Sequence, residues 1–492
     1  MGVISINFSL FFVVVFVVYY LPVCRKSPIF QNIWLLTASY FFYGYADWQM
    51  MPLLFGATIV FYSLGWWLRS EMQKNHVKAA SRITTLGVVL GVGLLLYFKY
   101  FNFFADSFAQ LLNAIGLHVT WTTLNIVLPI GVSFFTFKLI SYIIEIHREH
   151  ILPSRDFIDF ATYIAFFPTI LSGPIDRPNQ FLPQLRQVRT FDYGMAVDGC
   201  RQILWGMFTK MCIADNLASV TDDVWNDISA YSGSVLTITA LLYLVQMYAD
   251  FDGYSNMAIG MAKILGLGVT KNFNHPFLAR NIAEYWSRWH MSLTLFITDY
   301  VFMPLNIKFR NIEKWGICLA TIINLVVIGL WHGANWTYAV FGLYHGLLFV
   351  PLVFSGAFGK NKKLRSNKYG LPHLKDLMSM ILTSCFVAFG LILFRATSLE
   401  EACQYYMKIF SLELLELPKG LSDLGFVYYL RVFIFILLII EWTNRNMQYG
   451  LEIKEGTILQ KHFFLRWLLY VILIIVTFLY KGTQAQFIYF QF

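Results

Sequence analysis

The sequence has 492 residues, of which 58% are hydrophobic, 18% are aromatic and only 13% are charged. A soluble domain carries about 25% charged residues, so this chain lacks the side chains for a solvated surface, and its apolar content excludes a disordered or collagenous chain. Repeated apolar stretches of about 18 residues predict an all-α polytopic membrane protein. The net charge of +9 does not indicate a nucleic-acid partner, because Lys and Arg lie mainly between the apolar stretches.

The first third of the chain predicts five membrane-spanning helices. The candidate spans are residues 4–22, 29–48, 52–68, 83–104 and 121–143. Arg25 and Lys26 follow the first span and a basic segment at 69–82 follows the third, which places both on the cytoplasmic side. The first span is preceded by no positive charge, so we interpret it as a retained helix that begins outside the cytoplasm rather than as a cleavable signal.

The last third also alternates regularly between apolar and basic segments. Its candidate spans are residues 315–333, 336–355, 377–394, 425–441 and 464–480. The charge pattern of the loops places the C-terminus outside. About 11 transmembrane helices are expected in the whole chain.

The middle of the chain, residues 156–314, does not alternate cleanly. Its apolar stretches are short, interrupted by Gly and Pro, and contain several arginines. Irregular backbone at membrane depth is tolerated only where it is buried in protein or lines a cavity, so we expect half-helices and re-entrant segments here. The sequence therefore predicts a single integral membrane domain with N-terminal helices (1–155), a catalytic core (156–360) and C-terminal helices with an external tail (361–492).

A histidine lies where two predicted helices meet, in the string from Gly329 to Trp336 (GLWHGANW). Imidazole suits proton transfer, and a water-poor aromatic site would keep His332 neutral, as a general base requires. A histidine that joins helices through a hydrogen bond fits the same pattern, and the residues alone do not decide between the two. For His345, further along the second helix, we favour the structural interpretation. Trp331, Asn335 and Trp336 are candidate walls of the site.

The second candidate string, EYWSRWHMS, runs from Glu284 to Ser292. On a helix, Trp286, Trp289 and His290 would share one face and Arg288 would point elsewhere. Tryptophan and arginine near an apolar boundary usually form an interfacial belt, so this string alone is weak support for a site.

Two carboxylates, Asp250 and Asp252, end an apolar stretch. Paired carboxylates can share a proton or bind a cation. We favour capping of a helix that begins near Ser255, or ion pairing with an arginine. The six scattered cysteines show no metal-ligand spacing, and no nucleotide-binding or serine-hydrolase motif is present, so no metal and no bound cofactor are expected.

Five strings in order make the chain resemble the membrane-bound O-acyltransferase superfamily, in the bacterial branch typified by the membrane subunit of alginate O-acetylation. The strings are FPTILSGPI at 167–175, DGYSNMAIG at 252–260, NFNHPF at 272–277, WSRWHMSL at 286–293 and WHG at 331–333. Two details depart from the family pattern. Ser287 replaces the first arginine of W-R-R-W-H, and MPLNI at 303–307 replaces a segment ending in Pro-Leu-Gly-Gly.

The resemblance implies a bundle with a central tunnel in which a cytoplasmic acyl donor meets an external acceptor. It implies a catalytic His332, with His290 as the second signature residue. The expected donor is acetyl-CoA or a carrier-protein thioester. Arg177 and Arg186, with neighbouring arginines, match the phosphates of coenzyme A, although positive-inside bias is the interpretation that we favour for them.

The chain ends in FIYFQF at 487–492. This ending resembles a terminal motif of some of these acyltransferases and suggests that the phenol of Tyr489 relays the acyl group. A tyrosine hydroxyl has a pKa near 10 and needs a base to become a nucleophile. An aromatic belt that anchors the tail at the membrane interface is the other interpretation.

The expected function is transfer of an acyl group to a hydroxyl of a cell-envelope polysaccharide, and acetyl is the acyl group that we favour. The expected location of the protein is the bacterial cytoplasmic membrane. The expected partners are membrane lipid, a secreted or membrane-anchored acyltransferase partner and a cytoplasmic acyl carrier. The alternatives are D-alanyl transfer to teichoic acid, and a polysaccharide or lipid-linked sugar transporter without acyl chemistry.

Overall fold

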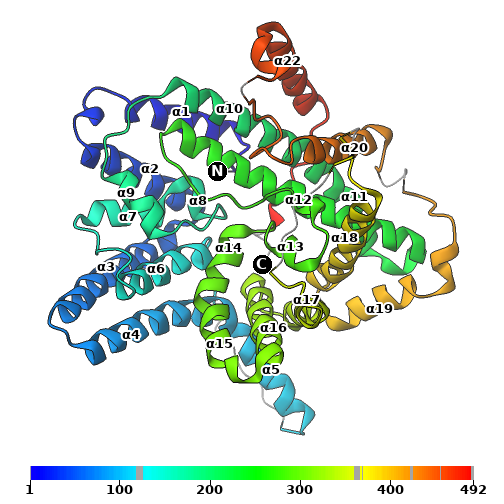
Figure 1. Cartoon of the computed structure of the whole chain (residues 1–492), viewed down its shortest axis with the longest axis horizontal. Coiled ribbons are helices and arrows are strands. Elements are labelled where there is room, and N and C mark those ends of the chain that lie inside the picture. Colours follow the sequence, from blue (N-terminus) through cyan, green and yellow to red (C-terminus); the bar gives the residue numbers. More distant parts are fainter. Residues whose placement is uncertain are drawn as a thin grey trace. The chain divides into compact units, whose positions relative to one another are not determined.

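The computed structural model describes residues 2–117, 126–359, 366–367, 370–421, 425–454 and 456–488. Within these ranges the chain consists of helices and loops, apart from one isolated bridge between Ser366 and Pro372. The helices are labelled in chain order in Figure 1. The chain divides into two compact units. The first comprises Met1–Cys200 and Ala258–Thr270, and the second comprises Arg201–Met257 and Lys271–Phe492.

The long apolar helices confirm the predicted class. Six helical stretches in the described part of the chain are long and apolar enough to cross a membrane: Pro28–Gln73, Val77–Ala114, Gly233–Ile264, Arg310–His332, Trp336–Phe354 and Leu374–Arg395. Two shorter apolar helices are Ile6–Tyr19 and Phe463–Leu479. The chain is therefore an all-α polytopic membrane protein. The expected total of about 11 crossings stays a prediction.

The first unit packs its longest helices side by side. Its helices are α1 (Ile6–Tyr19), α2 (Pro28–Asp47), α3 (Met51–Gln73), α4 (Val77–Leu95), α5 (Phe101–Ala114), α6 (Val132–His147), α7 (Phe157–Ala165), α8 (Phe167–Ile170), α9 (Pro178–Leu185) and the start of α10 (Tyr193–Phe208). Helix α6 packs against α3 and α4 (Figure 1). Glycines allow this close approach, since a Cβ on Gly65 would lie 2.7 Å from the Tyr142 ring.

Two predicted spans of the first unit have different bounds in the structure. Helix α4 continues through a π-helical turn, Leu96–Tyr100, into α5, so the predicted span 83–104 and part of its loop form one helical stretch. Helix α6 begins at Val132 rather than near residue 121. Pro129 and the left-handed Gly131 (φ +75°) precede it and end any helix from the N-terminal side. Residues 118–125 lie outside the described part.

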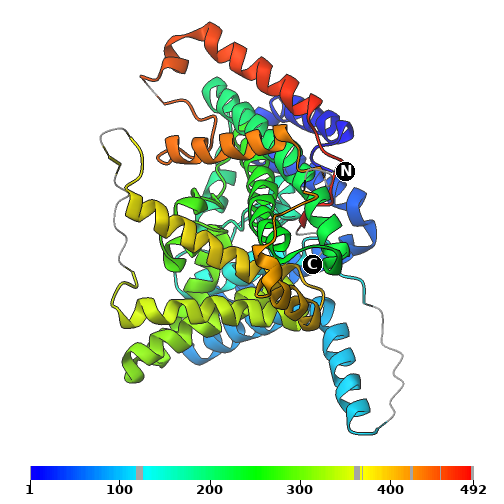
Figure 2. The same ribbon diagram turned by 90° about the vertical axis from the view of Figure 1, so that its right-hand side faces the viewer.

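The second unit contains the end of α10 and all later helices. These are α11 (Asp215–Asn226), α12 (Gly233–Ile264, whose last residues belong to the first unit), α13 (Ile282–Trp286), α14 (Met291–Ile297), α15 (Met303–Lys308), α16 (Glu313–His332), α17 (Trp336–Phe354), α18 (Leu374–Arg395), α19 (Leu399–Ile409), α20 (Tyr428–Thr443), α21 (Ile458–Lys461) and α22 (Phe463–Leu479). Helices α16 and α17 form a tight hairpin, and α18 packs on α17 (Figure 2). A Cβ on Gly346 would lie only 2.9 Å from the Ile322 Cα, so glycine is required at this contact.

The expectation of broken helices throughout 156–314 is wrong at one place. Most helices of this segment are short, but α12 is continuous over 32 residues. Gly253 interrupts the apolar pattern of the sequence but does not break the helix. It allows a neighbouring segment to pack closely against α12. A Cβ at this position would lie 2.8 Å from the Oγ1 of Thr209, next to α10.

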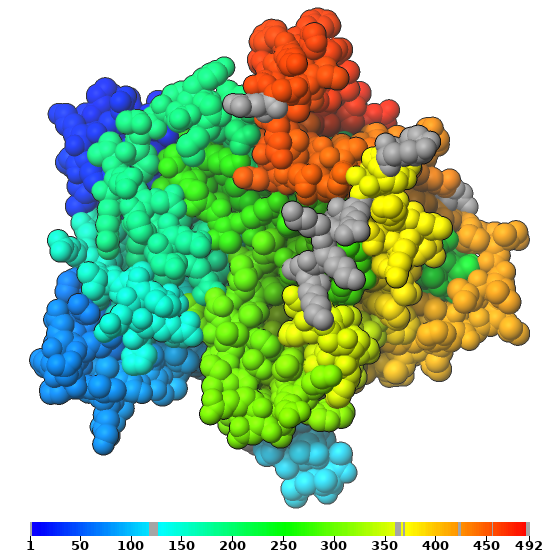
Figure 3. Space-filling view, viewed as in Figure 1, coloured from blue at the N-terminus to red at the C-terminus, as the bar shows by residue number. Residues whose placement is uncertain are grey.

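Helix α22 shows how apolar the outer surface of the second unit is. It appears in orange and red in the space-filling view (Figure 3), and Thr477 is its only fully buried residue. Trp467 is 52% exposed and Ile475 is 51% exposed. Exposed apolar surface of this extent is typical of a helix that faces lipid.

Candidate active site

Two histidines from separate segments of the chain lie close together in the second unit. His332 is the last residue of α16, and Gly333 follows it in extended conformation. His290 lies directly before α14 in the left-handed conformation, with φ +43°. The centroids of the two imidazole rings are 6.5 Å apart, and both side chains are buried. The RWH and WHG strings of the sequence therefore meet in one place.

Aromatic rings surround this pair. Phe251 meets His290 edge-on at 4.6 Å, Trp331 lies 5.7 Å from His290, and Phe394 lies 5.0 Å from His332. Burial lowers the pKa of His290 to about 3. The His290 imidazole is therefore neutral at physiological pH and keeps one nitrogen lone pair, the form that can accept a proton.

A small cavity of about 10 Å³ lies beside His332. Its lining is mostly aromatic and aliphatic: Met247, Tyr285, Trp286, Trp289, His332, Phe341, His345, Val387, Leu391 and Phe394. This volume is about what a single water needs. Trp286 and Trp289, two of the predicted site residues, therefore do face the same space as His332.

His345 differs from the simple structural histidine that we favoured. It is fully buried on α17 and lines the cavity with His332, and neither of its ring nitrogens has a hydrogen-bond partner within the described residues. The hydrogen bond expected of a helix-joining histidine is thus not seen there. A Cβ on Gly390 would lie 2.7 Å from its Nε2, so the glycine of α18 makes room for the imidazole.

The spacing of the EYWSRWH string predicted a single helix, and this prediction is wrong. Helix α13 ends at Trp286, and a turn leads to the left-handed His290. Arg288 donates to Glu284 Oε1 and to the carbonyl of Asn274, both at 2.9 Å. These contacts give Arg288 a role in holding the turn, and it does not line the cavity.

Asn335 and Trp336 do not wall the cavity either. The Asn335 side chain caps α17 by accepting from the N–H of Thr337, and its amide donates to the carbonyl of Thr397 at 2.7 Å. Trp336 is 56% exposed. The helix start at Asn335 directs Trp336 outward, so the expectation that both line the site is corrected.

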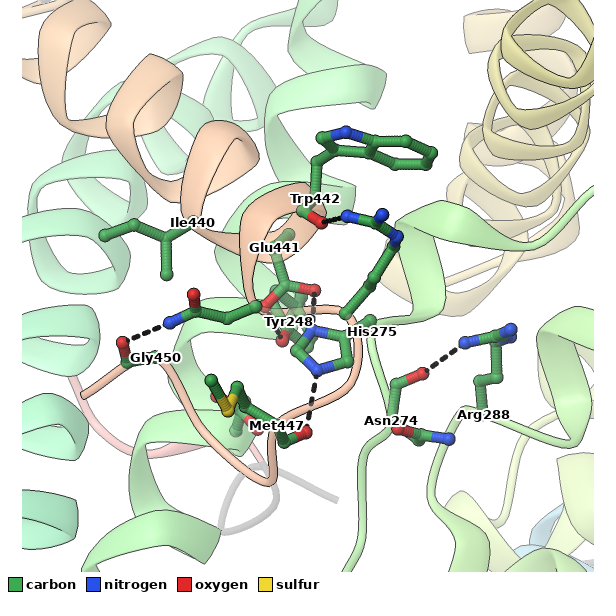
Figure 4. A network of polar contacts seen from close by, with 12 residues as sticks. Tyr248, Asn274, His275, Arg288, Ile440, Glu441, Trp442, Met447 and Gly450 are labelled. Carbon is green, nitrogen blue, oxygen red and sulfur yellow. Dashed lines mark hydrogen bonds and ion pairs between the residues drawn. The ribbon is translucent and has the colours of Figure 1, made fainter. Parts of the chain in front are cut away.

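A polar network holds the loop before α13 to α20 (Figure 4). His275 Nδ1 lies 3.1 Å from the carboxylate of Glu441, and its Nε2 lies 3.1 Å from the carbonyl of Met447. The Tyr248 hydroxyl, on α12, donates to the other oxygen of Glu441 at 2.8 Å. The NFNHPF string therefore acts in the scaffold of the second unit.

Asp250 and Asp252 lie inside α12 and cap no helix, because no helix begins near Ser255. Lys210 Nζ lies 2.6 Å from Asp250 Oδ1 and 2.7 Å from Asp215 Oδ1, with all three side chains buried. The expected ion pair is present, with a lysine in place of an arginine. Asp252 accepts from the Asn256 amide at 2.8 Å.

The predicted phosphate-binding arginines belong to the first unit. Arg177 is half-buried at the start of α9, and Arg186 is exposed. Their neighbour Arg189 is buried and donates to the Tyr19 hydroxyl and to Asn32 Oδ1, both at 2.6 Å, so it serves the scaffold. No group of three or more His, Cys, Asp or Glu side chains suited to a metal occurs in the described ranges.

Tyr489 lies outside the described residues, which end at Ile488. The segment before it is buried, and the ring of Phe487 lies 4.6 Å from Tyr254 and 6.0 Å from Phe251. Lys210 and Phe251 were not predicted as functional residues from the sequence. A lysine inside an apolar stretch was the available signal for the first of them.

Comparisons with known proteins agree with the motifs. A model of the membrane-bound O-acyltransferase family matches residues 146–392. A probable alginate O-acetylase, AlgI, of Pseudomonas aeruginosa is 35% identical over 386 residues, 78% of this chain and 70% of the relative. A peptidoglycan O-acetyltransferase of Helicobacter pylori is 29% identical over 77% of this chain and 73% of its own length. A teichoic acid D-alanyltransferase of Bacillus subtilis is 31% identical over 55% of this chain and 69% of its own length.

Proposed function

The chain belongs to the membrane-bound O-acyltransferase family, and from this premise we propose that it transfers an acetyl group from a cytoplasmic thioester to a hydroxyl of a cell-envelope polysaccharide. The relatives that cover most of the chain are named as alginate and peptidoglycan O-acetylating proteins. Both acceptors are glycans that offer hydroxyl groups. The observation that carries the proposal is the buried pair of His290 and His332 beside a small, mostly apolar cavity.

The chemistry assigned to His332 is general-base catalysis. Its imidazole takes the proton of the attacking hydroxyl while the oxygen bonds to the thioester carbonyl carbon. The carbon–sulfur bond then breaks, and the thiolate leaves with the proton that the imidazole carried. The surrounding rings exclude water and so limit hydrolysis of the thioester.

The narrowness of the site supports acetyl, a short acyl group, as the transferred group. The cavity of about 10 Å³ holds about one water at most, so any acyl group must displace buried side chains, and a shorter group displaces fewer of them. The donor is acetyl-CoA or a carrier-protein thioester that approaches from the cytoplasm. Phosphates of coenzyme A would suit Arg177 and Arg186, whose guanidinium groups match phosphate oxygens.

The acetyl group then has two routes to the polymer. In the first, the phenol of Tyr489 takes the acetyl group as an ester and passes it on. In the second, the group goes to a secreted or membrane-anchored partner without a covalent intermediate on this chain. We place the protein in the bacterial cytoplasmic membrane with both termini outside, because the loop charges favour that orientation.

D-alanyl transfer to teichoic acid is the second candidate. Its relatives align with little more than half of this chain, and a D-alanyl group would displace more of the buried side chains beside His332 than an acetyl group would. Membership in an acyltransferase family removes the basis for the third alternative, a transporter without acyl chemistry.

Mass spectrometry of the envelope polymer tests the proposal. Cells with the protein should carry acetyl esters on a glycan, and cells without it or with His332→Ala should lack them. The matched control is His462→Ala, an exposed histidine that should leave the esters unchanged. Loss of a general base lowers the rate by about 10²–10⁴-fold. D-alanyl esters, or acetylation that survives in His332→Ala, would contradict the proposal.

A further inference from the structure

Two buried hydrogen-bond donors line one cavity, and neither has a partner within the described residues. One is the indole Nε1 of Trp286, at the end of α13, and the other belongs to the imidazole of His345, on α17. Trp286 is 4% exposed and His345 is 0% exposed. Both line the cavity of about 10 Å³ that His332 also lines. Since buried polar groups are nearly always paired, two unpaired donors at one cavity indicate that a ligand pairs with them.

The two rings are held in place by aromatic packing. Their centroids lie 5.4 Å apart and their planes meet at 88°. The ring of Phe341 lies 4.5 Å from His345 and 6.5 Å from Trp286. A Cβ on Gly390 would lie 2.7 Å from His345 Nε2, so α18 confines the imidazole as well. Aromatic faces are weak acceptors at best, so these contacts fix the two donors without satisfying them.

The missing partner must be an acceptor. An indole N–H can only donate, and a neutral imidazole donates from one of its two nitrogens. None of the described residues that line the cavity is Asp, Glu, Lys or Arg. The space is about what a single water needs, which is also the space that one oxygen atom of a ligand would take. A carbonyl oxygen meets these conditions, because it offers two lone pairs and brings no charge of its own.

We propose that Trp286 and His345 form an oxyanion hole that binds the carbonyl oxygen of the donor thioester beside His332. The inference rests on the proposed function and assigns the groups that stabilise the charge developing in its reaction. Both residues are catalytic in the sense that their N–H groups touch the reacting carbonyl.

The step is balanced in protons and electrons. The hydroxyl oxygen bonds to the carbonyl carbon while His332 takes the hydroxyl proton. The π-electron pair of the carbonyl moves onto its oxygen, and the N–H groups of Trp286 and His345 donate to this oxygen. When the carbon–sulfur bond breaks, the pair returns to restore the carbonyl, and the leaving thiolate takes the proton from His332. Trp286 and His345 keep their protons throughout.

Isotope-edited infrared spectroscopy tests the contact directly. The full-length protein in detergent carries His332→Ala, so that bound acetyl-CoA with a ¹³C carbonyl persists. Hydrogen bonds to the carbonyl oxygen weaken the carbon–oxygen bond and lower its stretching frequency. The frequency should rise when His345→Leu or Trp286→Phe is added to this background. His462→Leu and Trp467→Phe are the matched controls, since both residues are exposed, and they should leave the frequency unchanged.

Initial rates give the second readout, with acetyl-CoA as donor and envelope glycan from cells that lack the protein as acceptor. His345→Leu and Trp286→Phe should each lower kcat by about 10²–10³-fold and leave the KM for acetyl-CoA nearly unchanged, because the donors act on charge that develops in the transition state. His345→Asn and His345→Gln restore an amide N–H near one or the other ring nitrogen. At least one of them should keep about 10 times the kcat of His345→Leu.

Thermal unfolding separates a catalytic from a structural role. His345→Leu removes an unpaired buried polar group, so it should melt at no lower temperature than the wild type. If His345→Leu does not fold, the spectrum and rate of Trp286→Phe carry the same test.

The outcomes separate this inference from the proposed function. A frequency that is the same with and without the two side chains, whether or not kcat falls, would overturn the oxyanion hole and leave the proposed function standing. Absence of bound acetyl-CoA in His332→Ala would overturn the proposed donor and this inference with it. A frequency that rises in both variants, together with a lower kcat at a nearly constant KM, supports both.

Discussion

Two buried polar groups contact neighbouring residues of α12, Phe251 and Asp250, and their surroundings differ in charge. The histidine pair is surrounded by rings, as the contacts of His290 with Phe251 and Trp331 show. The cluster of Lys210, Asp215 and Asp250 instead places the lysine within 2.7 Å of two carboxylates. A neutral imidazole needs a surrounding without charge, whereas a buried cation is held best by charge-assisted hydrogen bonds. The comparison separates residues suited to proton transfer from residues suited to binding.

The largest effect should come from removing the cation at the centre of the buried cluster of Lys210, Asp215 and Asp250. Lys210→Met leaves two buried carboxylates without their cation and should lower the free energy of unfolding by about 3–5 kcal/mol. Lys74→Met, which breaks an exposed pair with Glu71, should change stability little. Reversible unfolding in mixed detergent measures both. Equal losses of stability in the two variants would show that burial adds nothing to the contribution of the Lys210 ion pairs.

An intermediate effect is expected at the apolar cavity. Leu391→Ala enlarges the space beside His332 and should raise the rate ratio of propionyl to acetyl transfer about 10-fold or more. Leu382→Ala on the same helix, where the side chain is 57% exposed, should leave the ratio unchanged. Initial rates with the two coenzyme A thioesters give the ratio. If both variants keep the wild-type preference, the cavity does not select the acyl group.

The smallest effect concerns a histidine whose surroundings are charged, unlike those of His290. Burial lowers the pKa of His275, but the hydrogen bond and charge of Glu441 outweigh it and the pKa is raised. Its stabilising contribution is therefore complete below its usual pKa of about 6.5 and is lost as the pH rises through the raised native value.

Thermal unfolding of the wild type and of His275→Gln over a pH series measures this contribution. The difference in melting temperature should be greatest at about pH 5.5 and should shrink toward about pH 9, by about 4 °C or less. His462→Gln, an exposed histidine, controls for titration elsewhere. A difference that grows with pH would reverse the sign assigned to the Glu441 contact.

The sequence predicts the hairpin of α16 and α17 closely, but it does not predict α12. The expected spans 315–333 and 336–355 correspond to Glu313–His332 and Trp336–Phe354, because uninterrupted apolar stretches and the Asn335 cap mark both ends. In α12 the same rules fail, because Gly253, Asp250 and Asp252 in the sequence predict the end of a helix, whereas the helix continues through them. Their contacts with α10 and Lys210 come from tertiary packing, which periodicity does not contain.

For the site, motifs identified the histidines but not the geometry around them. The helical spacing assumed for Trp286 to His290 was wrong because His290 adopts a left-handed conformation. Trp336 belongs to the same sequence string as His332, yet its side chain is exposed. Lys210 and Phe251 contribute through contacts between segments distant in sequence, and only the folded chain brings those segments together.

The burial of Phe487 against Tyr254 and Phe251 has a kinetic consequence. A group carried by residues that are covalently continuous with the enzyme meets its reaction partner in an intramolecular encounter, so its effective concentration is set by the fold and not by the amount of protein. Under the proposed relay through Tyr489, loading would be first order once the donor is bound, and its rate would be independent of dilution.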